Sequence, residues 1–365
     1  MSIIQAIILG IVQGLTEFIP ISSTAHLVFA SRAVGLYDGV EQVLRNEQTT
    51  ATIAVIQLGT LLAVLIYFAG DIWKITRAFI HDHLALLRGQ RSEGALDMTM
   101  MGARPVRLSE EAWLGWLIII GSIPIATVGL LLKKLIEGPL TKNLWVIATM
   151  MIFVALLLAV AEVFARRRQK QRTMSELGLK DALAVGGAQV LALIPGASRS
   201  GTTIMAGLFA GETRETAARF SFLLSIPAIA ASGLLELKEA YEKLPEGSFL
   251  PLAIATVVSG IVGYASIWFL LRFLRTHSTG IFIGYRIVVG VLIFALLIAG
   301  VMNPYYGAQA ETQPAQPAQQ NQNSAPANER ELLPSNLATN NNRKDSVNLS
   351  RPPSRTKSRK RSKGR

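Results

Sequence analysis

Six stretches of about twenty apolar residues recur along this chain, each long enough to cross the roughly 30 Å hydrocarbon core of a bilayer. Half of the 365 residues are hydrophobic and only 16% are charged, which is far less charge than a soluble domain carries. The sequence therefore predicts an all-α integral membrane protein. The expected spans lie near residues 50–70, 113–133, 143–165, 217–236, 250–271 and 281–301.

Two pairs of shorter apolar segments remain, at residues 2–19 with 21–36 and at residues 182–194 with 200–211. Pro20 and Pro195 separate the halves of each pair, and proline ends a helix because it lacks an N–H donor and restricts the residue before it. Backbone broken at membrane depth is tolerated only where it lines a polar cavity. We therefore expect two re-entrant helical hairpins in addition to the six spans.

The order of these segments is hairpin, three spans, hairpin, three spans. Because three is odd, the second half should be inverted relative to the first, with repeat one at about residues 1–165 and repeat two at about 182–303. FIPISST at 18–24 also aligns with LIPGASR at 193–199, which places Ser23 opposite Ser198. Inverted repeats of this kind form their sites at mid-membrane, where the broken segments meet. Residues 1–303 should form this one membrane domain.

The composition changes beyond residue 303. Residues 304–365 are rich in Gln, Asn, Pro, Ser and Ala, which predicts a disordered tail. Its basic end is suited to anionic lipid or nucleic acid, but a solvated tail without a specific nucleic-acid partner is the simpler interpretation. The connections at 71–112, 166–181 and 272–280, read as loops, hold most of the remaining Lys and Arg and are expected in the cytoplasm.

The first break has a carboxylate close to it. Gln13 and Glu17 are four residues apart, so they share one helix face just before Pro20. A charge at membrane depth costs about 2.5–3.5 kcal/mol on insertion scales and marks a candidate functional site. The structural alternative is a protonated Glu17 in an interhelical hydrogen bond.

Hydroxyls and a histidine follow the same break. Ser22, Ser23 and Thr24 are suited to cap the helix that begins there. His26 lies one turn further on, beside Ser22 and Ser23. Capping explains one hydroxyl, but not three together with an imidazole, so we expect reactive groups here.

The second break, PGASRSGTT at residues 195–203, combines permissive backbone with hydroxyls and one guanidinium. N–H groups at the start of the following helix point into the break, where the helix dipole favours an anion. Arg199 adds a fork of donors that matches phosphate oxygens. The structural alternative is a packing turn in which Arg199 pairs with Glu17.

Together the two clusters supply an anion clamp, a carboxylate, an imidazole, and a hydroxyl that acts as nucleophile or positions water. Hydrolysis of a phosphoanhydride needs this set, and placement at membrane depth implies a substrate with a lipid tail. The rival interpretation is an inverted-repeat transporter or lipid flippase, in which Arg199 and Glu17 bind substrate and proton. A transporter does not need a hydroxyl beside His26, and a structural scaffold would leave both clusters unexplained.

The sequence resembles the undecaprenyl-diphosphatase, or bacitracin-resistance protein, family of bacterial inner membranes over approximately residues 1–303. The motifs that carry the likeness are QGLTEFIPISSTAH at 13–26, IQLGTLLAV at 56–64 and PGASRSGTT at 195–203. This resemblance implies hydrolysis of undecaprenyl diphosphate to undecaprenyl phosphate and inorganic phosphate, which recycles the lipid carrier for peptidoglycan synthesis and confers bacitracin resistance. It also implies six spans and two re-entrant hairpins in inverted repeat.

The resemblance further assigns roles to residues of both breaks. It implies a catalytic group of Glu17, Ser23 and His26, and binding of the diphosphate by Ser198, Arg199 and Thr203. We count Arg199 among the catalytic residues as well, because it faces the transferred charge. Further side chains expected to contact the substrate are Gln13, Ser22, Ser200 and Thr202.

A divalent cation, Mg²⁺ or Ca²⁺, is also implied. The family has Glu or Gln at the first position of its five-residue carboxylate motif, and this chain has Gln13. Glu17 is therefore the expected protein ligand, completed by phosphate oxygens and water. The sequence does not separate Ser23 from water as the nucleophile. Membrane lipids are further expected partners, a homodimer is compatible with the sequence, and the site is expected to open to the periplasm.

Overall fold

The computed structural model describes residues 1–38, 40, 42–88, 108–132, 143–245 and 247–304, and the regular elements within these ranges are all helical. Six helices in the described part are long and apolar enough to cross a membrane. They are α3 (Gln42–Tyr67), α5 (Glu110–Leu131), α7 (Leu144–Arg167), α10 (Arg214–Lys243), α11 (Phe249–Leu274) and α12 (Gly280–Ile298). The predicted fold class, an all-α membrane protein with six spans, is confirmed.

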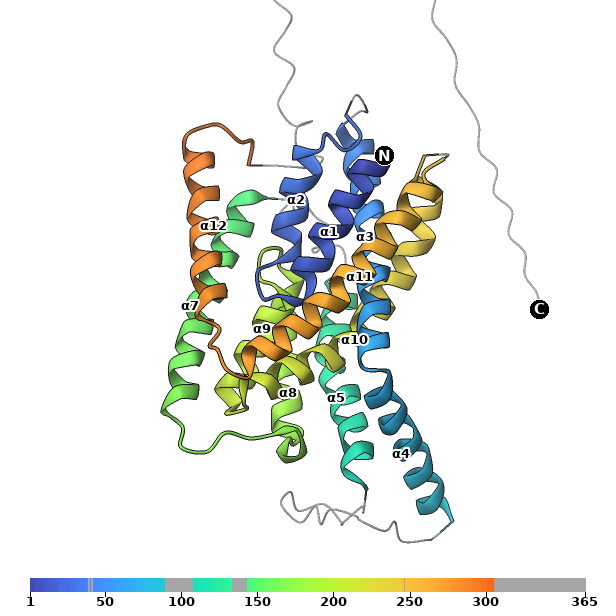
Figure 1. Ribbon diagram of the computed structural model, residues 1–365, viewed down its shortest axis with the longest axis vertical. Coiled ribbons are helices and arrows are strands. Elements are labelled where there is room, and N and C mark those ends of the chain that lie inside the picture. The colour runs from blue at the N-terminus through green and yellow to red at the C-terminus, as the bar shows by residue number, and fades with distance from the viewer. Residues whose placement is uncertain (39, 41, 89–107, 133–142, 246, 305–365) are drawn as a thin grey trace, which may run out of the picture. The chain divides into compact units, whose positions relative to one another are not determined.

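The N-terminal helix pair breaks at a proline, as predicted. Helix α1 (Ile3–Phe18) begins with a capping box between Ser2 and Gln5 and ends two residues before Pro20. Helix α2 (Ser23–Ala33) follows and packs back against α1 (Figure 1). The first break is therefore the turn of a helical hairpin.

The second pair is built in a similar way. Helix α8 (Leu179–Gln189) tightens into the 3₁₀ turn η4 (Val190–Leu193) just before Pro195, and α9 (Arg199–Ala210) then packs against α8. Gly211, with φ of 92°, ends α9 in the left-handed conformation typical of helix C-termini. The re-entrant topology and the inverted repeat, which are defined relative to a membrane, stay predictions.

The segment after α3 differs from the loop predicted at residues 71–112. Helix α4 (Ala69–Leu87) follows its N-cap residue Phe68 and packs against α5. Ile75 and Phe79, which are four residues apart, lie against Gly115 of α5. The many charged residues of this segment hid its helical period from the sequence argument. A short 3₁₀ turn, η3 (Met174–Glu176), interrupts the predicted 166–181 loop.

Close helix crossings position the two breaks. Helix α11 packs against α1 and α3, and α9 packs against α7 and α10. A Cβ on Gly59 of α3 would lie 2.0 Å from the Thr256 carbonyl oxygen of α11, so only glycine allows this approach. Phe18, the last residue of α1, meets Phe222 of α10 edge to face at 5.4 Å between ring centroids. This contact fixes the end of α1, where Glu17 lies.

Two of the basic connections lie toward the same end of the described helices. Figure 1 shows the end of α4 and the connection from α7 to α8 toward its lower edge, whereas the N-terminus and the start of α3 lie toward its upper edge. This grouping agrees with the predicted Lys/Arg asymmetry. The expected tail falls on residues 305–365, outside the described residues, so its disorder and the domain boundary at 303 stay predictions.

Candidate active site

Both breaks end in a serine with unusual backbone geometry. Ser22 precedes α2 with φ of 77°, and Ser198 precedes α9 with φ of 70°. Positive φ is uncommon for residues other than glycine, and such strain concentrates at functional sites. The structure therefore pairs Ser198 with Ser22, not with Ser23 as the sequence alignment predicted. The second break has one more residue between its proline and its cap.

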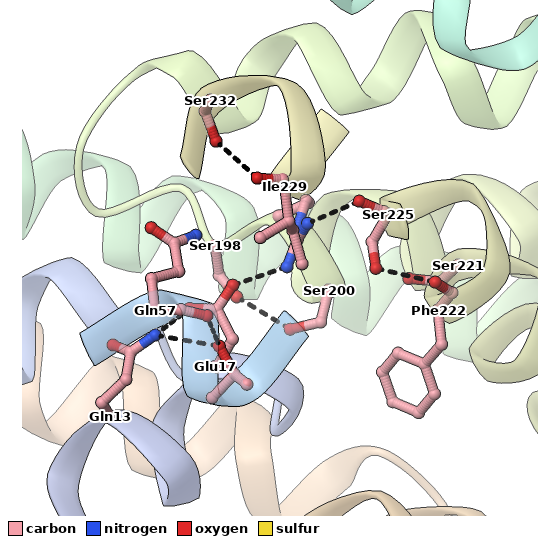
Figure 2. A network of polar contacts seen from close by, with 12 residues as sticks. Gln13, Glu17, Gln57, Ser198, Ser200, Ser221, Phe222, Ser225, Ile229 and Ser232 are labelled. Carbon is pink, nitrogen blue, oxygen red and sulfur yellow. Dashed lines mark hydrogen bonds and ion pairs between the residues drawn. The ribbon is translucent and has the colours of Figure 1, made fainter. Parts of the chain in front are cut away.

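An ion pair joins the two breaks. A terminal nitrogen of Arg199 lies 2.5 Å from a carboxylate oxygen of Glu17, and the Glu17 side chain is buried while that of Arg199 is partly buried. The other terminal nitrogen donates to the Ser225 carbonyl at 3.3 Å. Figure 2 shows this link between the end of α1 and the start of α9. The pairing considered as an alternative is therefore present, and the two breaks meet as predicted.

Gln13 supports the carboxylate from one turn earlier on α1. Its Nε2 donates to the second oxygen of Glu17 at 3.0 Å and to the Thr60 hydroxyl at 3.5 Å (Figure 2). Its Oε1 is buried and has no hydrogen-bond partner among the described residues. An amide oxygen of this kind is a ligand type that Mg²⁺ and Ca²⁺ accept.

Oxygen donors for a cation are therefore present next to the ion pair. Glu17 and Gln13 would hold a divalent cation together with phosphate oxygens and water, because hard cations prefer oxygen ligands. The described ranges contain no group of three or more His, Cys, Asp or Glu suited to a metal. The donor set fits a cation that is completed by its substrate.

The hydroxyls of the second break are largely committed to the protein backbone. Ser198 accepts from the Gly201 N–H at 3.2 Å and caps α9, and Ser200 donates to the Ile19 carbonyl of the first break at 3.4 Å. Thr202 and Thr203 are fully buried and donate to the Arg199 carbonyl at 3.0 and 2.8 Å. These bonds hold Arg199 at the helix start, and contact of the four hydroxyls with substrate stays a prediction.

His26 lies beside the first break, but with a partner that the sequence did not indicate. Its Nδ1 is 2.7 Å from the Ser22 carbonyl, and its Nε2 is 2.7 Å from the hydroxyl of Tyr285 on α12. Ser23 is half-buried, and no hydrogen bond joins it to His26 within the part of the chain that the structure describes. A Ser23–His26 nucleophile and base pair therefore stays a prediction.

A second arginine, Arg286 of α12, was missed by the sequence argument. It is completely buried, and a lone arginine inside the apolar run at 281–301 is the signal that could have found it. Its guanidinium donates to five carbonyl oxygens at 3.0–3.3 Å. They belong to Pro20 of the first break, Gly196 and Ala197 of the second, and Met150 and Met151 of α7. Arg286 therefore links both breaks to each other and to α7 through its hydrogen bonds.

Comparisons with known proteins agree with this arrangement. The sequence profile of the family described as bacitracin resistance protein BacA matches residues 6–292. The undecaprenyl-diphosphatase of Syntrophobacter fumaroxidans is 52% identical over 290 residues, which cover 80% of this chain and 95% of that protein. Those of Chloroherpeton thalassium and Myxococcus xanthus are 45% and 43% identical, covering 84% and 87% of this chain and 100% and 96% of their own lengths. With both breaks inside the matched region, the chain belongs to the BacA family.

Proposed function

We propose that this protein hydrolyses undecaprenyl diphosphate to undecaprenyl phosphate and inorganic phosphate, and so recycles the lipid carrier and confers bacitracin resistance. The observation that carries the proposal is the Arg199–Glu17 pair where the two breaks meet. It brings a guanidinium, a group suited to binding phosphate, next to a carboxylate between apolar helices. The names of the curated relatives support the same reaction.

The reaction is a displacement at the terminal phosphorus. Arg199 exchanges Glu17 for phosphate oxygens and stabilises the charge that develops there. His26 accepts a proton from the nucleophile, which is water or the Ser23 hydroxyl. The bond from phosphorus to the bridging oxygen then breaks, and undecaprenyl phosphate leaves. Attack by water releases inorganic phosphate directly, whereas attack by Ser23 forms a phosphoserine that a water molecule must hydrolyse in a second step. A divalent cation held by Glu17 and Gln13 would supply further charge neutralisation when bound.

The setting of the reaction follows from the membrane spans. Six spans make the chain a multi-pass membrane protein, and we place it in the bacterial inner membrane with polyprenyl diphosphate and membrane lipids as partners. Because Lys and Arg are enriched in cytoplasmic connections, the end of the molecule that carries the basic connections should face the cytoplasm. The breaks would then open toward the periplasm.

Phosphate release in detergent tests this function. We expect the purified chain to release phosphate from undecaprenyl diphosphate with Mg²⁺ or Ca²⁺ and to stop with EDTA. Arg199→Ala and Glu17→Ala should each lose on the order of 10²-fold in turnover, since each removes electrostatic stabilisation of the transition state. Transport needs a sealed membrane, so hydrolysis in detergent also separates an enzyme from a flippase.

A second ion pair provides the matched control. Arg275 and Glu215 are 2.7 Å apart, lie away from the breaks, and connect α10 with the residue after α11. Arg275→Ala and Glu215→Ala should keep nearly full turnover. Near-normal phosphate release by the Arg199 or Glu17 variant would remove that residue from the mechanism.

A further inference from the structure

The partner of His26 on α12 has a defined geometry. The Tyr285 hydroxyl lies 2.7 Å from Nε2 of His26, and the two rings are stacked with 5.6 Å between centroids and 12° between planes. Tyr285 therefore contacts the imidazole twice, through a hydrogen bond at Nε2 and through ring stacking, while the Ser22 carbonyl contacts Nδ1.

These contacts determine which ring nitrogen is basic. The Ser22 carbonyl oxygen can only accept a hydrogen bond, so Nδ1 of His26 carries a proton. A neutral imidazole has one N–H, which leaves the lone pair on Nε2. The Tyr285 hydroxyl must then donate to Nε2. In the neutral ring, Nε2 is the nitrogen that can take a proton from a nucleophile.

The position of Tyr285 depends on its neighbour in the chain, Arg286. It precedes Arg286, whose buried guanidinium donates to carbonyls of both breaks. The position of Tyr285 relative to the breaks is thus fixed by the same helix turn. The tyrosine is also 42% exposed, so a water molecule that reaches the site can replace His26 as the partner of its hydroxyl.

We propose that Tyr285 is the positioning residue of His26: the Ser22 carbonyl sets the Nδ1–H tautomer, and the Tyr285 hydroxyl holds the orientation of the ring through its basic nitrogen Nε2. This inference rests on the proposed role of His26 as general base. During the reaction, the O–H of the nucleophile replaces the Tyr285 O–H at Nε2 and passes its proton there. Tyr285 keeps its own proton and donates to water.

Removing the hydroxyl tests the proposal by two readouts. In Tyr285→Phe the stacking remains, but the imidazole loses the hydrogen bond at Nε2 that restricts its broad two-fold χ2 torsion. Loss of one neutral hydrogen bond should lower kcat about fivefold with KM unchanged. The chain has four histidines, so ¹⁵N-histidine labelling of the full chain in detergent gives a simple spectrum. His26→Gln identifies the His26 signals.

We expect the wild-type spectrum to show His26 with a protonated Nδ1 and an unprotonated, hydrogen-bonded Nε2, and Tyr285→Phe to show a shifted Nε2 signal. Tyr264→Phe is the control, because Tyr264 is equally exposed at 44% and its hydroxyl has no hydrogen-bond partner among the described residues. A protonated Nε2 in the wild type, or Tyr285→Phe kinetics equal to those of Tyr264→Phe, would overturn the proposal.

The remaining outcomes are also decisive. A rise in KM alone would mean that Tyr285 contacts the substrate instead of positioning His26, and would equally refute the proposal. If the wild-type chain released no phosphate, the proposed function would fail, whereas the tautomer spectrum would still report whether Tyr285 positions the imidazole.

Discussion

Glu212 is a carboxyl group buried between α9 and α10 without a partner. Its side chain is fully buried, and neither oxygen has a hydrogen-bond partner among the described residues. Burial, together with the charge of Asp181, raises its pKa from 4.5 to about 8, and Arg172 opposes this only in part. The Arg172 guanidinium is held by Asp181, so Glu212 should stay protonated at neutral pH.

This pKa makes stability depend on pH in a defined direction. The folded chain keeps the Glu212 proton up to about pH 8, whereas the unfolded chain releases it near 4.5. Between these values the folded state binds more protons, so the free energy of unfolding falls as pH rises. At about 1.36 kcal/mol for each pKa unit, the contribution lost by pH 8 is on the order of 5 kcal/mol.

Thermal unfolding in detergent between pH 5 and pH 9 measures this effect. Glu212→Gln cannot ionise, so its Tm should equal that of the wild type near pH 5 and exceed it by several degrees, roughly 5–10 °C, at pH 9. Glu215→Gln, at a neighbouring carboxylate that pairs with Arg275, should follow the wild-type curve. Parallel pH curves for the wild type and Glu212→Gln would refute the reasoning, because they would mean that Glu212 titrates alike in both states.

Two further variants test the contacts made by the arginines Arg286 and Arg214. Arg286→Met leaves the carbonyls of Pro20 and Gly196 without their donor, so phosphate release should fall at least tenfold because both breaks lose their placement; an active enzyme with unchanged Tm would contradict this. Glu162→Gln weakens the buried contact with Arg214 and the bonds to Thr279. The free energy of unfolding should therefore fall by roughly 3–5 kcal/mol, while KM stays constant. An unchanged melting curve would contradict this prediction.

The breaks could be predicted because their causes are local. Pro20 and Pro195 end the preceding helices through their own geometry, and each span is set by a run of apolar residues. The meeting of Arg199 with Glu17 also followed from sequence, since a buried charge needs a partner. What failed locally was register: the sequence aligned Ser23 with Ser198, whereas backbone conformation pairs Ser22 with Ser198.

The remaining site residues were missed because their partners are distant in sequence. Tyr285 lies 259 residues from His26, and no periodicity within the 281–301 run signals that contact. Arg286 could have been found only as a lone charge in an apolar run, because its acceptors are backbone carbonyls, which carry no sequence signal. Helix α4 was missed for another reason, because its many charged side chains hid the apolar face formed by Ile75 and Phe79.

The resting pair of Glu17 and Arg199 also determines what must enter the site with the substrate. Two charges buried together are stabilised mainly by each other, since both have lost their hydration. When a diphosphate takes Arg199, Glu17 is left as a carboxylate beside additional negative charge. Positive charge must therefore accompany the substrate to Glu17, and the free Oε1 of Gln13 on the same helix face offers a second oxygen ligand for it. We propose that a divalent cation enters with the substrate for this reason, so cation affinity should depend on bound diphosphate rather than on a preformed cage of carboxylates.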